Sequence, residues 1–392
     1  MRLAVYTDYV YRRDGRAVYA DRAFALFVSR LGEELEHLTL LGRVDPRPGR
    51  SHYELPAHTE FVPLPYYSTL ARPFSAAPAM LRSLGVFWRT LGGVDAVWLL
   101  GPSPLTIVFA MLAGLRGRRV VLGVRQDLPR YARSRHPGRW SILAAAVLLE
   151  SVNRLIARWA SAIVVGPDLA RHYRRAARLL TLSVSLVRAE DILSEHAALG
   201  RSYEGELRVL SVGRLEAEKN PLLLVDVLAR LNAADPRWRL VVCGEGPMEP
   251  QLRASLRAAG LEDRADVRGY VPIEDGLRDL YLESHLFLHV SWTEGLPQVL
   301  FEAFAAGLPT VATAVGGVAD ASGDSALLVP PGNPEAAATS LERLAREPGL
   351  RSELVVSALE RARWHTLDAE CSRVHRFIAD SVRERGRRGR LA

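Results

Sequence analysis

Short apolar runs alternate with segments of helical spacing along almost the whole chain. Runs of strand length lie at 3–7, 37–41, 61–64, 96–100, 119–125 and 162–166, and helical patterns at 22–31, 78–91 and 141–159. A second series has strands at 207–212, 239–243, 266–268, 286–290, 310–314 and 326–329, with helices at 221–231, 250–259, 274–282, 297–306 and 334–346. Such alternation is typical of βαβ units built on a parallel sheet.

The alternation loosens between residues 176 and 205, where polar residues follow the strand-like run 182–187. A chain of 392 residues is long enough for two domains of ordinary size. We therefore predict an α/β protein with one doubly wound domain at 1–200 and another at 201–366, the boundary falling near residue 200.

Cysteine usage and hydropathy favour the cytoplasm. Cys243 and Cys371 are the only cysteines, so no disulfide framework is expected. The N-terminus opens directly into a strand pattern, which predicts no leader. The longest apolar run, 140–149, is too short to span a bilayer, and Glu150 and Arg154 interrupt its continuation. We expect no membrane-spanning segment.

Positive charge is concentrated in the first half of the chain. Residues 1–200 hold 27 Arg against 16 Asp and Glu, whereas residues 201–392 hold 23 Arg and one Lys against 28 acidic residues. Eight Arg fall within 116–139. They form either a solvated basic face or a surface for an anionic membrane or a phosphorylated acceptor. No recognition module accompanies the charge, so nucleic acid is not expected as a partner.

The chain contains 50 Arg but a single Lys, Lys219. An ammonium is a compact point charge on a flexible stem, and a planar guanidinium does not replace it where one charge must sit on a phosphate oxygen. The one retained lysine therefore suggests a specific role, the alternative being retention by chance.

Two carboxylates, Glu294 and Glu302, lie within an otherwise apolar segment at 291–307 that runs from a strand into a helix. Glu294 falls in the expected loop and Glu302 in the expected helix, with Pro297 at a favourable first helical position. Their separation, on the order of 10 Å, suits contacts with two ends of one ligand better than a shared proton. Gly295 removes a side chain where a ligand approaches, and the helix N-terminus offers N–H groups to phosphate.

The pair Glu294 and Glu302, followed by Gly-Leu-Pro at 307–309 and Gly-Gly at 316–317, resembles the signature of the retaining GT-B glycosyltransferases of family four, the glycosyl transferases group 1. The resemblance implies two Rossmann-like domains facing a cleft, and a last helix at about 367–392 that packs back on the first domain. It implies that Glu294 faces the donor hexose and that Glu302 binds ribose hydroxyls. The donor-binding residues of the same motif are Gly295, Leu296, Pro297 and Val299.

A second motif supplies two cations after a strand and a glycine turn, Gly213-Arg214 and Lys219. In the family that this sequence resembles, the matching Arg and Lys neutralise the leaving nucleoside diphosphate. None of the 18 Asp has another Asp two positions away, so the usual D-x-D metal pair is missing. We therefore expect leaving-group stabilisation by side chains and N–H groups, with no metal and no cofactor.

Two further segments resemble nucleotide-binding parts of the family. The run 240–247 ends in a turn containing Gly244 and Gly246, and a dinucleotide fingerprint is excluded because its third glycine position is occupied by Glu249. The segment 267–272 resembles the one whose backbone reads the base, so Tyr270 and Val271 are candidate contacts, with packing equally open for Tyr270.

The first domain matches less closely. Gln126 stands where many family members carry a His that touches the donor sugar, and an amide can hydrogen-bond a hydroxyl but cannot shuttle a proton. Asp127 is either an acceptor-side base or a cap of the next segment. The family's glycine-rich loop is altered, with Asp14-Gly15 the nearest match.

The histidine and cysteine pairs fall short of a zinc site. His285 and His289 are four residues apart, as are Cys371 and His375, and neither pair reaches three or four ligands. We interpret all four as structural.

These features together predict a metal-independent retaining glycosyltransferase that moves a hexose from a nucleoside-diphosphate sugar to a hydroxyl of a glycan, a lipid-linked or a small-molecule acceptor. The expected location is cytoplasmic, with possible peripheral attachment to a membrane. Two alternatives are a non-catalytic sugar-nucleotide binding protein or inactive partner subunit, and, less favoured, a sugar-nucleotide 2-epimerase.

Overall fold

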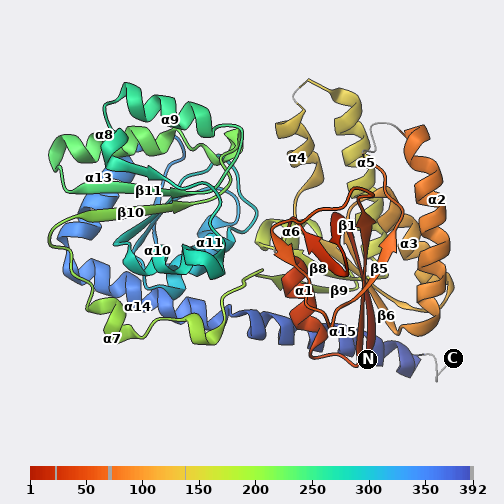
Figure 1. The fold of residues 1–392 in the computed structure, drawn as a ribbon. Helices are drawn as coiled ribbons and strands as arrows, with labels where there is room; N and C mark the ends of the chain where they lie inside the picture. The colour runs from red at the N-terminus through yellow and green to blue at the C-terminus, as the bar shows by residue number, and fades with distance from the viewer. Residues whose placement is uncertain (23, 69–72, 137, 389–392) are drawn as a thin grey trace. The chain divides into compact units, whose positions relative to one another are not determined.

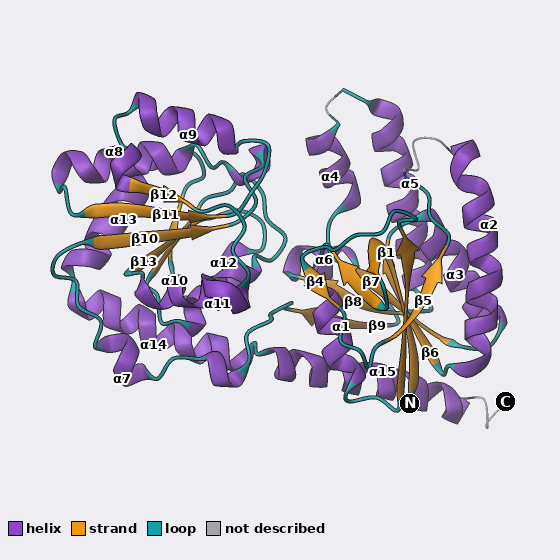
Figure 2. Ribbon diagram, in the orientation of Figure 1, coloured by secondary structure: helices purple, strands orange, loops and turns teal. Residues whose placement is uncertain are grey.

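The computed structural model describes residues 1–22, 24–68, 73–136 and 138–388. The chain divides into two compact units, one formed by Met1–Val184 with Asp368–Ala392 and the other by Ser185–Leu367. Each unit is a layered α/β fold with a parallel sheet at its centre (Figure 1, Figure 2). The prediction of two α/β domains is confirmed.

The first unit is built on one nine-stranded sheet. Its parallel strands lie in the order β5-β3-β1-β6-β7-β8-β9, and the end of β1 turns back with β2 and β4 as an antiparallel edge. The strands are β1 (Arg2–Asp14), β2 (Ala17–Ala20), β3 (His37–Val44), β4 (Tyr53–Glu54), β5 (Glu60–Leu64), β6 (Ala96–Gly101), β7 (Arg119–Val124), β8 (Ser161–Val165) and β9 (Arg178–Leu182).

Helices cover both faces of this sheet. One face carries a core of strand residues such as Val97 and Leu122 packed against Phe87, Phe109 and Ile156 from three helices. The other carries α1 and the C-terminal helix, where the Cys371 thiol lies 3.7 Å from the Phe27 carbonyl. The helices are α1 (Phe24–Gly32), α2 (Pro73–Thr90), α3 (Pro104–Leu115), α4 (Leu128–Arg135), α5 (Trp140–Ala157), α6 (Pro167–His172) and α15 (Leu367–Arg388), with a 3-10 turn at Leu91–Gly93.

The second unit has a six-stranded, fully parallel sheet in the order β12-β11-β10-β13-β14-β15. Its strands are β10 (Leu207–Val212), β11 (Trp238–Cys243), β12 (Ala265–Val267), β13 (Leu286–His289), β14 (Thr310–Thr313) and β15 (Leu327–Val329). Both sheets thus show the doubly wound Rossmann order, in which the chain starts at a central strand and reverses direction there.

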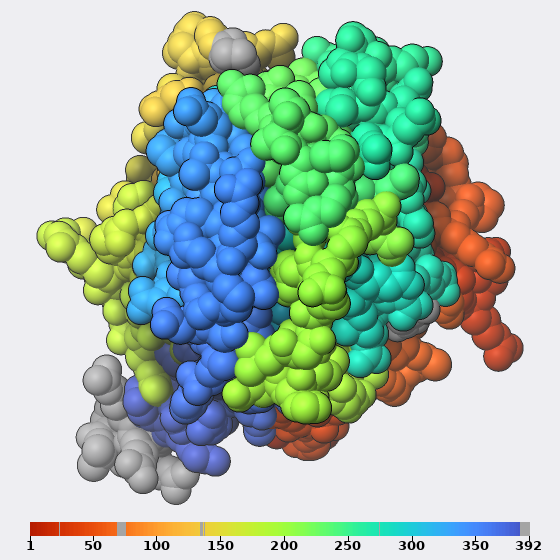
Figure 3. All heavy atoms as spheres, turned by 90° about the vertical axis from the view of Figure 1, so that its left-hand side faces the viewer, coloured from red at the N-terminus to blue at the C-terminus, as the bar shows by residue number. Residues whose placement is uncertain are grey.

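Two helical layers enclose the second sheet. Helices α8 (Leu223–Ala234), α9 (Glu249–Ala258) and α13 (Pro334–Arg346) cover one face, and the space-filling view shows α13, in blue, beside the green α8 (Figure 3). Helices α10 (Arg278–Glu283), α11 (Gln298–Ala305), α12 (Val318–Ser322) and α14 (Pro348–Trp364) cover the other. The remaining pieces are α7 (Glu195–Leu199), 3-10 turns at Ala189–Asp191, Ala217–Lys219 and Glu262–Arg264, and a distorted turn at Ile273–Leu277.

The structure places the boundary between the units at residue 184, earlier in the chain than the predicted position near residue 200. The segment after residue 184 packs on the second unit because Leu193 donates its N–H to the Ala305 carbonyl at 2.8 Å, and Ala198 is buried with Val355 and Leu359. Sequence spacing did not show this, since the segment carries no long periodic pattern.

The described part of the last helix, α15, packs on the first unit. Ser372 donates to Glu34 at 2.8 Å, and Ser381 is hydrogen-bonded to Ser161. Residues 389–392 of the predicted segment lie outside the described residues.

Candidate functional site

The carboxyl ends of β10 and β13 form the natural ligand site of the second unit. These two strands are neighbours at the centre of the sheet, where the strand order reverses, and open α/β sheets bind ligands in the crevice outside such a point. The loop after β10 carries Gly213, Arg214 and Lys219, and the loop after β13 carries Glu294. The topology therefore brings two separate sequence motifs to one edge.

Lys219 and Glu294 meet at this edge. The Lys219 Nζ lies 2.5 Å from Glu294 Oε1, and the two side chains are 20% and 7% exposed. Backbone contacts hold their loops together, since Ser291 Oγ and the Trp292 N–H both donate to the Glu218 carbonyl, at 3.1 and 2.9 Å. The only lysine of the chain is thus the partner of the first carboxylate of the motif.

His289, the last residue of β13, completes the cluster. Its Nε2 lies 3.1 Å from Glu294 Oε1, and both side chains are buried. Burial alone raises the pKa of the Glu294 carboxyl, but the close contact with His289 and the charge of Lys219 outweigh it and lower the pKa to about 2. Glu294 is therefore a carboxylate at neutral pH and accepts hydrogen bonds.

This contact places His289, which the sequence predicted to be structural, at the candidate site beside Glu294. The signal that identifies it is its position at the carboxyl end of a central strand, rather than its spacing from His285. His285 is structural, because its Nδ1 accepts the Arg208 N–H at 3.0 Å. Cys371 is buried and His375 lies by Glu34, and the described residues contain no cluster of three His, Cys, Asp or Glu that would hold a metal ion.

Glu302 has a different environment from Glu294. It lies in α11, which begins at Gln298, so Pro297 precedes the helix instead of starting it. Its Oε2 accepts the Tyr281 hydroxyl at 2.8 Å. Burial raises the pKa of the Glu302 carboxyl, and the Tyr281 hydrogen bond only partly opposes that shift. Among the described residues, no cation forms an ion pair with this carboxylate, so hydroxyl donors from a ligand would stabilise its ionised form.

Glycines let the loops of the site approach one another closely. A Cβ on Gly244 would lie 1.9 Å from the Gly213 carbonyl oxygen, and one on Gly246 would lie 2.4 Å from the Leu215 oxygen. Gly316 stands in the same relation to Glu294, whose carbonyl oxygen would lie 1.9 Å from an added Cβ. By contrast, a Cβ on Gly213 would meet nothing within 4 Å. The absence of a side chain at Gly316 therefore allows the loop that carries Glu294 to approach closely, and the space beside Gly213 stays open.

Arg214 lies on the same edge but is held by its own loop. Its guanidinium contacts Glu216 at 2.5 Å and Glu218 at 3.0 Å, and its side chain is 43% exposed. Its ion pairs are with Glu216 and Glu218, so its predicted role at a diphosphate requires it to exchange these partners.

The other predicted binding residues surround the edge. Leu296 and Val299 pack partly buried against the core below α11, and Gly295 is exposed. Tyr270 and Val271 follow β12, where the Gly269 carbonyl accepts the Gly244 N–H at 2.6 Å.

Gln126 and Asp127 lie in the first unit, at the carboxyl end of β7. Gln126 is exposed. Asp127 caps α4, because its Oδ1 accepts the Arg130 N–H at 2.9 Å, and its other oxygen lies 3.5 Å from His172 Nδ1. The capping alternative is thus realised, while a role as a base stays a prediction.

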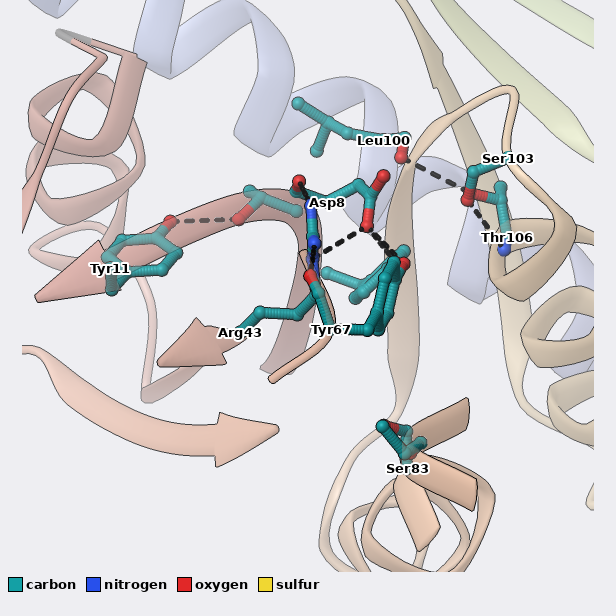
Figure 4. A network of polar contacts seen from close by, with 11 residues as sticks. Asp8, Tyr11, Arg43, Tyr67, Ser83, Leu100, Ser103 and Thr106 are labelled. Atoms are coloured by element: carbon teal, nitrogen blue, oxygen red, sulfur yellow. Dashed lines mark hydrogen bonds and ion pairs between the residues drawn. The ribbon is translucent and has the colours of Figure 1, made fainter. Parts of the chain in front are cut away.

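A polar network around Asp8, which lies inside β1 just beyond the residues that pair with β6, was missed from the sequence (Figure 4). Asp8 Oδ1 accepts the hydroxyls of Tyr67 and Tyr6 at 2.8 and 3.2 Å, and the buried Arg43 guanidinium lies 3.2 Å from the same oxygen. Arg43 also donates to the Asp8 carbonyl at 2.8 Å. The network lies where the strand order of the first sheet reverses, between β1 and β6. A lone Asp directly after the predicted strand 3–7 gives no spacing signal, so only the topology identifies it.

Comparison with known proteins agrees with this geometry. Residues 195–361 match the family model described as glycosyl transferases group 1. A D-inositol 3-phosphate glycosyltransferase from Frankia alni is 36% identical over 186 residues, 45% of each chain. The chain spans between about a quarter and somewhat under two thirds of the length of the first curated relatives it matches.

Solved structures are similar over nearly the whole chain. A sucrose-phosphate synthase from Thermosynechococcus elongatus has a TM-score of 0.72 at 19% identity, covering 97% of this chain and 98% of its own. The Anabaena protein HepE in complex with UDP has a TM-score of 0.70 at 16% identity, covering 97% and 100%. At such identities the likeness concerns the fold.

The chain has the two-unit GT-B fold of these solved structures, and residues 195–361 of its second unit match a glycosyltransferase family. Residues 195–361 match the glycosyl transferases group 1, the family that the sequence motifs resemble, and these residues include both Lys219 and Glu294.

Proposed function

We propose that the protein is a retaining glycosyltransferase that moves a hexose from a nucleoside-diphosphate sugar to an acceptor hydroxyl. The observation that carries the proposal is the contact between Lys219 and Glu294 at the switch point of the second sheet. An ammonium has three donors, so Lys219 can keep one on Glu294 while it offers another to a diphosphate oxygen.

Each residue of the site has a role that follows from its chemistry. The ionised Glu294 accepts hydroxyls of the hexose, and Glu302 accepts the ribose hydroxyls, which stabilise its buried charge. As the acceptor oxygen bonds to the anomeric carbon, the bond from that carbon to the diphosphate breaks. The negative charge that gathers on the diphosphate is stabilised by Lys219, by N–H groups, and by Arg214 once it leaves Glu216 and Glu218.

The donor assignment is supported by the UDP bound to the HepE structure, a protein of the same fold. The acceptor, whether glycan, lipid-linked or small molecule, belongs to the same proposal. So does metal independence, because the leaving group has cationic and N–H partners within the chain itself.

The experiment is a donor panel with and without chelator. The purified protein is incubated with UDP-, GDP- and ADP-hexoses in excess EDTA, and both transfer and donor hydrolysis are followed by NMR. Release of nucleoside diphosphate that persists with EDTA supports the proposal, and release that stops with EDTA contradicts metal independence. A donor that binds by calorimetry but is never consumed with any acceptor extract would instead indicate a binding protein, and epimerised UDP-N-acetylhexosamine would indicate the 2-epimerase.

A further inference from the structure

One side of the first unit exposes an apolar helix face beside concentrated positive charge. Helix α5 buries a narrow stripe that includes Ala146, Glu150, Asn153 and Ile156. Its opposite side exposes large apolar side chains, with exposed fractions of 79% for Trp140, 46% for Val147, 64% for Leu148 and 57% for Leu155. These recur at helical spacing, so they lie along one line of the helix.

The exposed stripe continues onto α3. Val108, Met111 and Leu115 are exposed on that helix at spacings of three and four residues. Trp159, just beyond α5, lies against Gly114 of α3, because a Cβ on this glycine would meet the Trp159 ring at 3.8 Å. The two helices are adjacent on the same side of the first unit (Figure 2). We call the exposed residues of α5 and α3, with Trp159, the apolar face.

Arginines are concentrated in the segment of the chain that carries the apolar face. Residues 104–160 contain ten Arg and only two acidic residues, and of these Glu150 is buried and Asp127 caps α4. Arg130, Arg133, Arg139, Arg154 and Arg158 are all exposed in the segments that form or adjoin α4 and α5. An apolar stripe with basic residues beside it is the arrangement by which helices lie in the interface of an anionic bilayer.

We propose that the apolar face and its arginines bind the surface of a bilayer rich in anionic lipid. The two Trp, one at each end of α5, are the residues that favour the membrane interface. A second copy of the chain is a poor occupant, because pairing two such faces brings their arginines together.

A membrane-spanning role is also a poor fit, although α5 is long and apolar enough by length and composition. Its buried side holds Glu150 and Asn153, and Asn153 donates to the Tyr173 hydroxyl at 2.8 Å. Leaving the domain would expose these polar groups to hydrocarbon. The helix therefore lies on the surface while it stays packed in the first unit.

The test is flotation of the full-length protein with vesicles of phosphatidylcholine alone or mixed with phosphatidylglycerol, at low and high salt. We expect flotation with the anionic vesicles at low salt and about tenfold or greater weakening at high salt, because salt screens the arginines. Equal flotation with both compositions, or none with either, would overturn the proposal.

Matched variants locate the surface. Trp140→Ser and the pair Leu148→Ser with Leu155→Ser should weaken vesicle binding by about tenfold or more, because each removes apolar area that enters the bilayer. Trp364→Ser is the control, since Trp364 is 78% exposed on α14 of the second unit and Trp140 is 79% exposed. Equal effects of Trp140→Ser and Trp364→Ser would contradict the proposed face.

The charge is tested in the same way. Arg154→Gln with Arg158→Gln should weaken anionic vesicle binding by about tenfold, whereas Arg346→Gln with Arg363→Gln on the second unit should leave it unchanged. Light scattering without lipid tests whether the apolar face binds a second copy of the chain instead. A dimer of the unaltered protein that Leu148→Ser and Leu155→Ser dissociate would overturn the lipid assignment in favour of a second copy.

Discussion

Glu294 and Glu302 are eight residues apart, yet their carboxyl groups are shifted in opposite directions. Lys219 and His289 lower the pKa of Glu294 to about 2, whereas burial raises the pKa of Glu302. The first is stabilised as an anion by the protein itself. The second is left to be stabilised by a ligand.

The low pKa of Glu294 predicts a defined pH dependence of stability. A carboxyl whose folded pKa is depressed contributes stability above its unfolded pKa, and this contribution is lost as the pH falls toward the folded value. The difference in free energy of unfolding between the native protein and Glu294→Gln should be about 3 kcal/mol at neutral pH and should shrink between pH 4.5 and pH 2. Urea unfolding at several pH values measures it, and a difference independent of pH would contradict the assignment.

Glu302 should behave in the opposite sense. Because its folded pKa is raised, the ionised carboxyl lowers stability as the pH rises above its unfolded pKa. Glu302→Gln should raise the melting temperature at neutral pH but weaken donor binding by about tenfold, since it removes charged acceptors for hydroxyls. Calorimetry with a nucleoside-diphosphate sugar checks the binding. A variant that is less stable and binds donor normally would refute the role of Glu302.

At the scale of elements, the site depends on close approach of two loops. Gly316 has a φ of +51° and leaves no room for a side chain beside the Glu294 carbonyl. Gly260 has a φ of +67° but would meet nothing within 4 Å with an added Cβ. A comparison of substitutions at the two glycines therefore separates the effect of backbone strain from the effect of close approach.

Gly316→Ala should destabilise the protein clearly more than Gly260→Ala. The second substitution costs about 1 kcal/mol of backbone strain alone, and the first adds displacement of the loop that carries Glu294. Thermal unfolding of the two variants gives the comparison, and donor binding should fall only for Gly316→Ala. Equal melting temperatures would show that the loop contact is not required.

The sequence predicted most of these elements because each buried strand is bounded by a helix of clear spacing. It predicted that Glu294 and Lys219 serve one site, and the structure places them in contact. It missed His289 at the end of β13 and Asp8 inside β1, because the place of a single polar residue in a site depends on the neighbouring strands. It also missed α14, whose apolar residues lie on several sides of the helix and show no single stripe.

At the scale of the molecule, two units with the same strand order each present one switch point. The family match, at residues 195–361, lies wholly within the second unit and leaves out the first unit. The Asp8 network and the apolar face both belong to that unit. The predicted facing of the two domains across a cleft stays a prediction.

The boundary at residue 184 predicts how the second unit behaves in isolation. A fragment spanning residues 185–367 should unfold cooperatively, whereas one spanning 201–366 should have a lower melting temperature. The shorter fragment loses Leu193 and Ala198, and it loses the Leu367 N–H that donates to the Val187 carbonyl at 2.7 Å. Circular dichroism during heating compares the two, and identical transitions would place the boundary near 200 after all.

The central claim is that the single lysine of this chain neutralises a leaving diphosphate, and Lys219→Arg tests it most directly. Turnover of a nucleoside-diphosphate sugar and the melting temperature are measured for the native protein, Lys219→Arg and Lys219→Ala. We predict that the Arg variant stays folded but turns over at least about tenfold more slowly, because a planar guanidinium does not place its charge where the ammonium lies. The Ala variant should lose roughly 10²–10³ in rate. An Arg variant with unchanged turnover and unchanged melting temperature would contradict the account.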